Sequence, residues 1–505
     1  MRGGDGPPGM RTVSIIGVAL AGAVALLLLL FAALLWWPFS NAPLPDQGQD
    51  RVIVGVRVVD VIAGTVGSPV SVEIRGGRIA AIGTGLAPTD VPPVDGRGAF
   101  LVPGFWDMHV HSFQASPQMH FPLWVANGIT TVRDMMDCPE ERDSLMACVA
   151  DKRRWNADVA AGQLVAPHIV ETASYFFENP DLLPPEARAR VRAYKARGVD
   201  AIKIYNRLPA AAYHAVAAEA ASQQLRLVGH LPKAIDLETA IDAGQISFEH
   251  AHVLPRHCFA RADELRRGEL DGMAPTALAE MIVAGYARSR CDAAFARMRQ
   301  AGAWHVPTHV TREEDARAGD PAFTNDVRLG YLDPLSRWAW HDDLAGTRSL
   351  YPGKRGQRAL RRYFEHGLRL TGAAHRAGVG ILVGTDTAIG GFRYHDEMAH
   401  LVRAGLTPAD VLRAATINAA RYAGLADSAG SVAVGKRADL VLLDANPLAD
   451  IGNARRIRAV IQGGRLYDRP RLDALLMFVR GQSDAIHNWA KLLWSFARSS
   501  VSSDL

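Results

Sequence analysis

The sequence predicts an α/β fold: a (β/α)8 TIM barrel with a small β-sandwich formed by both chain ends, behind an N-terminal transmembrane helix. Three observations support this prediction. Eight short apolar runs alternate with helical stretches over roughly 300 residues, as in barrels of this class. Similar β-rich text occurs near both ends of the 505-residue chain. One long uncharged apolar segment lies close to the N-terminus.

The N-terminal segment is expected to lie outside the folded body. No residue from Thr12 to Trp37 is charged, and this run exceeds the roughly 20 apolar residues that span a bilayer. Arg2 and Arg11 precede it, and Asp46 follows it. The positive-inside rule therefore predicts a cytoplasmic N-terminus and a membrane-anchored body on the exported side, periplasmic or extracellular. A cleaved signal peptide is the alternative, and it also exports the body.

Composition and charge limit the classes of partner. With 49% hydrophobic and 21% charged residues, the chain has enough apolar material for a large core. A net charge of +4 is too small at this length to indicate a nucleic-acid partner. The cysteine pairs closest in sequence, Cys138–Cys148 and Cys258–Cys291, could form disulfides in an exported compartment. Free buried thiols are the alternative.

The two ends of the chain have similar strand-like sequence patterns. A polar linker, residues 41–49, leads into strand-like runs that begin at Arg51. Gly-Gly-Arg occurs at 76–78 and again at 463–465, each time between two strands. This pattern predicts one sandwich with a larger domain inserted in it. The predicted divisions are 1–40 for the anchor, 51–100 with 430–470 for the sandwich, 101–429 for the barrel and 471–505 for a C-terminal helical extension.

The C-terminal extension has apolar residues at helical spacing between Leu472 and Arg498. This spacing predicts helix packed on the body or on a second subunit of a homo-oligomer. The alternative is a helix lying on the membrane surface, held near lipid by the N-terminal anchor.

Eight apolar runs are the predicted barrel strands. Helical stretches such as Ala210–Gln224 separate most of them, and the long connections 251–302 and 310–378 are expected to cover the barrel mouth. The predicted strands are Phe100–His109, Ile129–Arg133, His168–Glu171, Ala201–Tyr205, Arg226–His230, Ile246–His250, Ala303–Pro307 and Val379–Asp386.

Polar side chains close five of these runs, at the strand ends where barrel enzymes carry their chemistry. His109 and His111 are two residues apart, so on a strand both face one side and can bind one metal ion. Later runs end in further donors. One such residue would be unremarkable, but several at equivalent positions predict a metal site. The strand-end residues are His109, His111, Lys203, His230, His250 and Asp386.

Three motifs carry a family resemblance: the segment from Val102 to His111, the triplet Gly384-Thr-Asp, and a tail that includes Gly435-Lys-Arg-Ala-Asp-Leu-Val-Leu-Leu. From about Val52 to Tyr467 the sequence resembles the amidohydrolase superfamily, in its metal-dependent branch near the prolidase-like and imidazolonepropionase-like enzymes. In that family a small β-sandwich flanks the barrel.

The resemblance implies a binuclear site with two divalent metal ions. Zinc suits the nitrogen and oxygen ligands, though cobalt, manganese or iron would also fit. It implies that Asp386 moves a proton from a metal-bridging water to the leaving amine. The implied ligands are His109, His111 and Asp386 for the more buried ion, His230 and His250 for the second, and Lys203, carboxylated by CO2, as a bridge between them. The alternative for Lys203 is an ion pair with a nearby carboxylate.

The implied function is hydrolysis of a C–N amide-type bond in a small molecule, such as a dipeptide or an N-acyl amino acid. Candidate substrate contacts are Tyr205, His309 and His395. One alternative is a lactone, ester or phosphotriester hydrolase on the same site, since activated water attacks whatever electrophile lies above it. The other alternative is a non-catalytic binding protein of the envelope.

Overall fold

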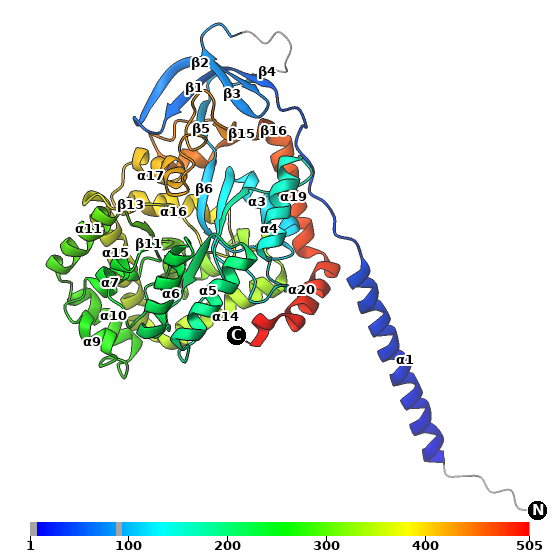
Figure 1. Cartoon of the computed structure of the whole chain (residues 1–505). Coiled ribbons are helices and arrows are strands. Elements are labelled where there is room, and N and C mark those ends of the chain that lie inside the picture. Colours follow the sequence, from blue (N-terminus) through cyan, green and yellow to red (C-terminus); the bar gives the residue numbers. More distant parts are fainter. Residues whose placement is uncertain (1–7, 87–92, 504–505) are drawn as a thin grey trace, which may run out of the picture.

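The computed structural model of the chain describes residues 8–86 and 93–503. Its first element is the helix α1 (Pro8–Trp36), which projects away from the body (Figure 1). The segment Val18–Trp36 is long and apolar enough to cross a membrane, and none of it is buried against the body. Arg2, which entered the orientation prediction, lies outside the described residues.

A composite sheet joins the two chain ends. Its strand order is β16-β15-β14-β5-β1-β2-β3, with β4 paired to β1. The prediction that both chain ends contribute to one β unit is therefore confirmed, while its description as two facing sheets stays a prediction. The strands are β1 (Arg51–Asp60), β2 (Thr65–Arg75), β3 (Arg78–Gly83), β4 (Pro93–Asp95), β5 (Phe100–Pro103), β14 (Leu440–Leu443), β15 (Ile457–Gln462) and β16 (Arg465–Tyr467).

Eight parallel strands lie between the two halves of that sheet, one in each predicted run. They form the sheets β6-β7-β8 and β13-β12-β11-β10-β9 in a TIM-barrel-like α/β fold. Backbone hydrogen bonds link the sheets, from Met108 N to Val383 O (2.8 Å) and from Ser174 N to Ala201 O (2.8 Å). The strands are β6 (Phe105–Val110), β7 (Ile129–Asp134), β8 (His168–Thr172), β9 (Ala201–Ile204), β10 (Arg226–Gly229), β11 (Gln245–Glu249), β12 (Trp304–Val306) and β13 (Gly380–Ile381).

The first predicted run proves to be two strands. It divides at Gly104, where the chain leaves the composite sheet and enters the barrel. A Cβ atom at Gly104 would lie 2.1 Å from Oγ1 of Thr130, so only glycine allows this crossing beside β7. The sharp passage brings β6 into the barrel with His109 near its end.

Helices separate the barrel strands, and the longest connections form a cap. The cap comprises α8–α11 after β11 and α12–α15 after β12. The helices are α2 (Ser116–Met119), α3 (Phe121–Ala126), α4 (Val149–Ala160), α5 (Pro184–Arg197), α6 (Ala210–Ser222), α7 (Leu237–Asp242), α8 (Val253–His257), α9 (Ala262–Arg267), α10 (Pro275–Ala284), α11 (Arg288–Ala301), α12 (His309–Arg317), α13 (Pro321–Thr324), η1 (Val327–Tyr331), α14 (Pro334–Leu350) and α15 (Gly353–Arg376).

The chain then returns along the body to its C-terminal extension. The C-terminal segment is helical, and its first helix, α19, packs on α2, α3 and β15. The elements are α16 (Phe392–Arg403), α17 (Pro408–Ala414), α18 (Ile417–Tyr422), η2 (Ile451–Arg455), α19 (Arg469–Asp484), α20 (Ile486–Arg498) and η3 (Ser500–Ser503).

The segment between α1 and β1 has no regular secondary structure, as a linker would, but it is bonded to the body. Asp46 N donates to Leu466 O (3.3 Å), and the Asp46 carboxylate pairs with Arg51 (2.9 Å). Nε2 of Gln47 donates to Gly162 O (3.2 Å). The base of α1 therefore has a defined place on the molecule.

Both predicted disulfides are present. Cys138–Cys148 links residues 10 apart beside α4, and Cys258–Cys291 links residues 33 apart within the cap. The second bridge ties the end of α8 to the start of α11.

We expect loss of the cap disulfide to lower stability more than loss of the shorter one. Chain entropy predicts a cost of about 3.7 kcal/mol for Cys258→Ala/Cys291→Ala and about 2.7 kcal/mol for Cys138→Ala/Cys148→Ala, because the longer loop restricts the unfolded chain more. Chemical unfolding of both double variants, with the unchanged protein as the reference, measures this. A smaller loss for the 258/291 pair would contradict the entropic explanation.

Candidate metal centre

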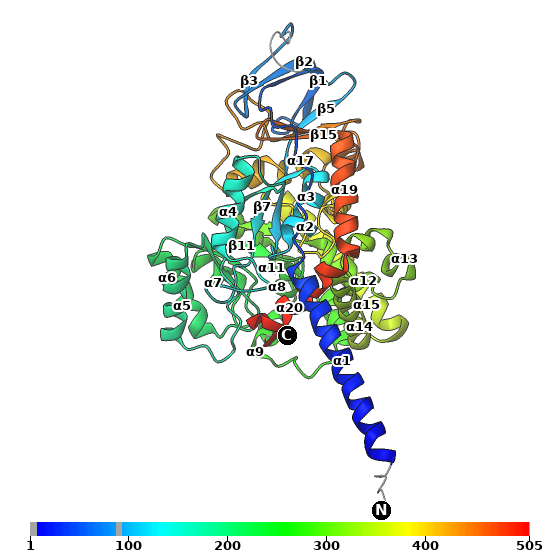
Figure 2. The ribbon, with the colours of Figure 1, turned by 90° about the vertical axis from the view of Figure 1, so that its right-hand side faces the viewer.

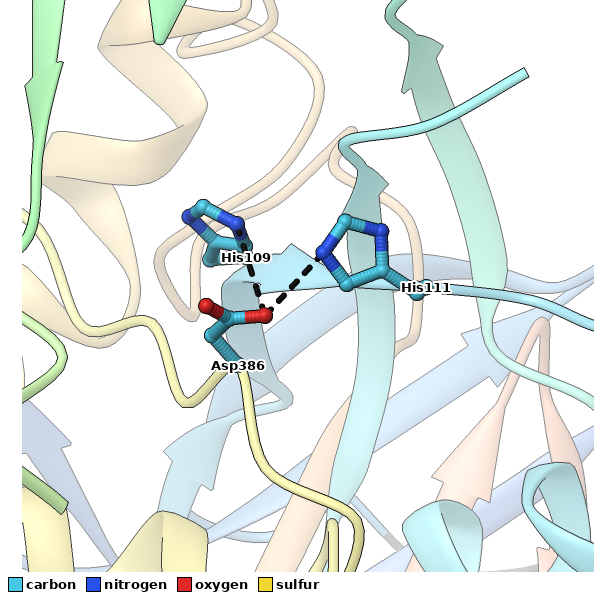
Figure 3. A group of neighbouring side chains, drawn as sticks. All are labelled: His109, His111 and Asp386. Carbon is cyan, nitrogen blue, oxygen red and sulfur yellow. Dashed lines mark ion pairs between the residues drawn. The ribbon is translucent and has the colours of Figure 1, made fainter. Parts of the chain in front are cut away.

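Three of the strand-end residues converge at the barrel mouth. Nε2 of His111 lies 3.0 Å from Oδ1 of Asp386, and Nε2 of His109 lies 3.7 Å from the same oxygen (Figure 3). One donor atom from each of these three residues lies within 4.8 Å of the other two. The histidines come from the end of β6 and the aspartate follows β13. These are the edge strands at which the two barrel sheets meet, so both sheets contribute to the cluster.

His230 and His250 extend the cluster across the next strands. Their Nε2 atoms face each other at 2.9 Å, and the rings of His109 and His250 are 5.0 Å apart. Nδ1 of His250 lies 3.7 Å from Oδ2 of Asp386. The four strand-end histidines thus form one cluster, in which His109, His111 and His250 lie near Asp386 and His230 contacts His250.

Lys203 is buried on β9, beside β10. Burial lowers its pKa to about 8, an effect that the nearby Asp386 carboxylate opposes. Its Nζ lies 5.9 Å from the ring centroid of Tyr205, and in the described part of the chain it forms no ion pair with a carboxylate.

Hydrogen bonds at Nδ1 determine which nitrogen each ring presents. His109 Nδ1 donates to Oε2 of Glu249 (3.1 Å). His230 Nδ1 donates to Oδ1 of Asn206 (3.0 Å), and Nδ1 of His250 lies within hydrogen-bonding distance of the Thr308 hydroxyl (2.8 Å). With the proton on Nδ1, Nε2 of His109 and of His230 keeps a free lone pair. This is how metal-binding histidines are usually oriented.

Glu249 is a functional residue that sequence reasoning did not identify. Its side chain is fully buried, and its carboxylate accepts a hydrogen bond from Nδ1 of His109. Both of its carboxylate oxygens lie 2.9 Å from Nη2 of Arg133. The available signal was an acidic residue next to a histidine at the end of an apolar strand.

A buried network extends from this pair. Nη1 of Arg133 donates to the hydroxyls of Ser247 (3.0 Å) and Tyr422 (3.0 Å), and Tyr422 donates to Glu171 (3.0 Å). Nε of Arg133 donates to the carbonyl of Met108, next to His109. Arg133 therefore supports the first metal-site histidine through its backbone and its side chain.

The backbone around the site is strained. Four non-glycine residues in the described ranges have positive φ, and three of them are His250 (+71°), Thr308 (+43°) and Asp386 (+49°). Such conformations cost about 1–3 kcal/mol each and persist where surrounding bonds enforce them. Asp386 is held by its N–H, which donates to His109 O (2.9 Å).

Asp107 connects the two strands that carry the first cluster. Its carboxylate accepts from Thr385 N (3.0 Å), from the Thr385 hydroxyl (2.6 Å) and from His109 N (3.2 Å). Gly384 completes this junction, since a Cβ there would lie 2.5 Å from Val306 and 2.9 Å from the Cβ of His109. The Gly384-Thr-Asp triplet is thus required by close packing as well as by its aspartate.

Electrostatics favour a cation at this point. Burial lowers the pKa of His111 to about 4, with Lys203 adding to the effect, and burial lowers that of His250 to about 3. Burial alone would raise the pKa of Asp386, but His109 and His111 hold it well below its ordinary value. At neutral pH His111 and His250 are therefore uncharged, beside an ionised Asp386 carboxylate.

These residues fit a divalent metal ion. Nε2 of His109 is buried and has no hydrogen-bond partner. Nε2 of His230, whose Nδ1 donates to Asn206, offers a lone pair and faces Nε2 of His250 at 2.9 Å. Imidazole nitrogen with carboxylate oxygen is a donor set that zinc and its neighbours in the first transition row accept.

A cavity of about 610 Å³ lies over the cluster, and cap residues form much of its wall. Tyr205 lines it, with its ring 3.9 Å from that of His230. Burial raises the pKa of Tyr205 to about 12, and Asp386 adds to the effect, so this phenol is a hydrogen-bond donor at neutral pH. The other lining residues include Lys233, His252, Arg256, Arg312, Tyr351 and Tyr363.

Two of the expected substrate contacts are corrected by the structure. His309 does not line the cavity; it is fully buried in the first turn of α12, with Nε2 3.1 Å from Oγ1 of Thr371. His395 is buried on α16, where Nε2 donates to Asn127 O (3.1 Å). Both side chains fill packing positions that elements distant in sequence create.

Comparisons with known proteins agree with this geometry. A family model described as "Amidohydrolase family" matches residues 100–467. Adenine deaminase 2 of Agrobacterium fabrum is 27% identical over 458 residues, 86% of this chain and 60% of that protein. Ochratoxinase of Aspergillus niger is 39% identical over 101 residues, 19% of this chain and 21% of that protein. The chain thus spans less than two thirds of the length of these curated relatives.

Solved structures share the fold. Bottromycin amidohydrolase superposes with a TM-score of 0.64 at 24% identity, covering 87% of this chain and 92% of its own. A Xaa-Pro dipeptidase with bound methionine superposes with a TM-score of 0.58 at 20% identity, covering 83% and 100%. At sequence identities this low, the similarity establishes only a shared fold.

We expect Glu249 to stabilise the protein at neutral pH and to lose this effect in acid. Burial opposes its ionisation, but Arg133 and His109 outweigh burial and lower its pKa to about 2. The folded state therefore holds fewer protons on this group than the unfolded chain. A stabilisation on the order of 3 kcal/mol is present above about pH 4.5 and disappears as the pH falls toward 2.

Chemical unfolding of Glu249→Gln and of the unchanged protein, from pH 7 down to pH 2, measures this effect. The two free energies of unfolding should differ by on the order of 3 kcal/mol at pH 7 and converge in acid. Glu186→Gln, in an exposed ion pair with Arg190, is the control and should show little difference at any pH. A difference for Glu249→Gln that does not depend on pH would contradict the assignment.

Proposed function

Since the chain belongs to the amidohydrolase family, we propose that it is a metal-dependent hydrolase that cleaves a C–N amide-type bond of a small molecule. One observation carries the proposal. Four strand-end imidazoles gather with an ionised aspartate beside a cavity, and hydrogen bonds at Nδ1 leave Nε2 of His109 and of His230 free for a metal. A binding protein would not need such an arrangement.

We assign two divalent ions, with zinc as the metal that the donors suit best. When bound, they would supply a Lewis acid and lower the pKa of water toward neutrality. We propose that the chain's ligands are His109, His111 and Asp386 for one ion, His230 and His250 for the other, and carboxylated Lys203 for both.

Asp386 is the proposed proton carrier. Its low pKa keeps it ionised at neutral pH, and it lies among the imidazoles of His109, His111 and His250. A carboxylate in this place can accept a proton from water and deliver it to the leaving nitrogen. Its positive φ keeps the side chain directed at the site.

Lys203 is suited to carbamate formation. An amine reacts with CO2 only when uncharged, and a pKa of about 8 leaves about a tenth of it uncharged at pH 7. The product, a carbamate, is anionic. It could bind the same cation as the neighbouring imidazoles. The buried lysine thus becomes a ligand, where a free ammonium group would repel metal.

The substrate binds in the cavity above the cluster. We propose that Tyr205 contacts it, because its ring lies against His230 and its hydroxyl stays protonated at neutral pH. A volume of about 610 Å³ is that of a small-molecule site. A dipeptide or an N-acyl amino acid is the proposed substrate class.

We propose further that α1 anchors the protein in a membrane and that the catalytic body lies on the exported side. The length of its apolar span and the two disulfides support this. Backbone bonds at both sheet junctions support closure of the eight strands into a barrel, 101–429, inserted in the β unit of 51–100 and 430–470.

We expect His109→Ala to lose bound metal and amide hydrolysis together, because it removes a buried ligand and leaves Glu249 and Arg133 without their third partner. Metal content by mass spectrometry and turnover of an amide panel, beside lactone and phosphotriester panels, measure this. His214→Ala on the exposed face of α6 is the matched control and should keep both. A His109→Ala protein with full metal content would refute the assignment.

We expect Lys203→Ala to lose activity by at least 100-fold and to regain part of it when short carboxylic acids are added. A small carboxylate can occupy the place of the carbamate and restore its two oxygen donors. Activity titrated against acetate or propionate measures the rescue, and chloride at equal ionic strength is the control. A fully active variant would exclude a bridging role for Lys203.

A further inference from the structure

We infer that α20 lies on the membrane surface beside α1, as a second contact between the body and the lipid. The inference rests on the proposed anchor. Four large apolar side chains of α20 are between 37% and 62% exposed, a high value for a helix that ends a globular body. They are Ile486, Leu493, Trp494 and Phe496. Ile486 and Leu493 are seven residues apart and so share one side of the helix.

α20 is in direct contact with α1 and the residues that follow it. The rings of Phe31 and Trp494 are 6.2 Å apart, and those of Trp37 and His487 are 6.0 Å apart. Nζ of Lys491 donates to the carbonyl of Trp37. The exposed apolar face of α20 therefore continues the apolar surface of the membrane-spanning segment.

The position of Phe31 defines the depth of this contact. Phe31 precedes Trp36, the last residue of the apolar span, by five residues, which places it about 7.5 Å inside the end of the helix. If the span is instead counted as about 20 residues from Thr12, it ends at Phe31. With either way of counting the span, Trp494, beside Phe31, lies at or within the boundary of the hydrocarbon core. This depth agrees with the insertion of about 5–10 Å that is typical of surface-bound helices.

α20 is fixed to the body, so its exposed face has a defined direction. Nε1 of Trp489 donates to Ser483 O (2.7 Å), and the hydroxyl of Ser144 donates to Ser495 O (2.7 Å). At its end, the Ser499 hydroxyl donates to the Asp143 carboxylate (2.8 Å). The apolar face is thus presented by a docked helix.

Charge complements the proposed occupant. The ionisable side chains of α20 are Lys491, Arg498 and His487, and the helix contains no carboxylate. The anionic headgroups of a bilayer attract such a helix, at about 1 kcal/mol for each cation near the surface. A second copy of this chain would bring the same cations together, so we favour lipid as the occupant.

The arrangement turns the cap toward the membrane. In Figures 1 and 2, α1 leaves from the end of the molecule that carries α9 and α20, and the strands β1–β3 lie at the opposite end. Leu265 of α9, Leu278 of α10 and Leu350 of α14 line the cavity. The cap helices therefore stand between the lipid surface and the metal site.

Fluorescence from a single introduced cysteine tests the inference in the full chain. All four native cysteines form disulfides, so a new thiol can be labelled selectively with an environment-sensitive dye. The test position is Leu493→Cys. Val434→Cys is the matched control, because Val434 is 62% exposed against 51% for Leu493 and lies before β14 of the composite sheet. Leu27→Cys, within the span of α1, reports the anchor itself. The protein is reconstituted in vesicles of phosphatidylcholine and phosphatidylglycerol.

We expect the dye at 493 to shift its emission to the blue in vesicles and to lose at least half its intensity with nitroxide-labelled lipid, while the dye at 434 does neither. If the dyes at 493 and 434 behave alike while that at 27 is quenched, the anchor holds and α20 is not in lipid. If the dye at 27 is also unquenched, the anchor fails. A dye at 493 that is blue-shifted, unquenched by lipid and close to a second dye would assign the face to a second copy.

Discussion

The buried contact among Glu249, Arg133 and His109 is the interaction on which the site depends. A carboxylate with both oxygens on a guanidinium is removed from water at the centre of the barrel, where an unpaired charge would be costly. The same carboxylate holds the Nδ1 proton of His109 and thereby turns Nε2 toward Asp386. Arg133 thus keeps ionised the carboxylate that orients His109.

The remaining ligands are placed by backbone constraint. Asp107 bonds Thr385 and His109 at once, which sets β6 and β13 in register at the point where the sheets meet. His250, Thr308 and Asp386, which have positive φ, follow strand ends, where the chain turns sharply. Local strain in the loops is therefore offset by the regular strands beneath them.

Much of this arrangement could be predicted from periodicity. A strand alternates its faces, and the ends of parallel strands meet at one edge, so apolar runs that close in His, Lys or Asp predict a shared site. The eight strands and the four gathered histidines follow from that rule. His309 and His395 were not predicted correctly by this rule. Their side chains contact Thr371 of α15 and Asn127 after α3, and a local sequence pattern does not reveal such contacts. The division of the first run at Gly104 depended likewise on a neighbour, Thr130.

The short segment that joins α1 to β1 has a mechanical consequence. Because Asp46 and Gln47 are bonded to the body, the connection has little freedom to swivel. With α1 as the proposed anchor, a tilt of α1 in a thinner or thicker bilayer would move the whole body with it. Bilayer thickness would then set the height of the cavity entrance above the membrane surface.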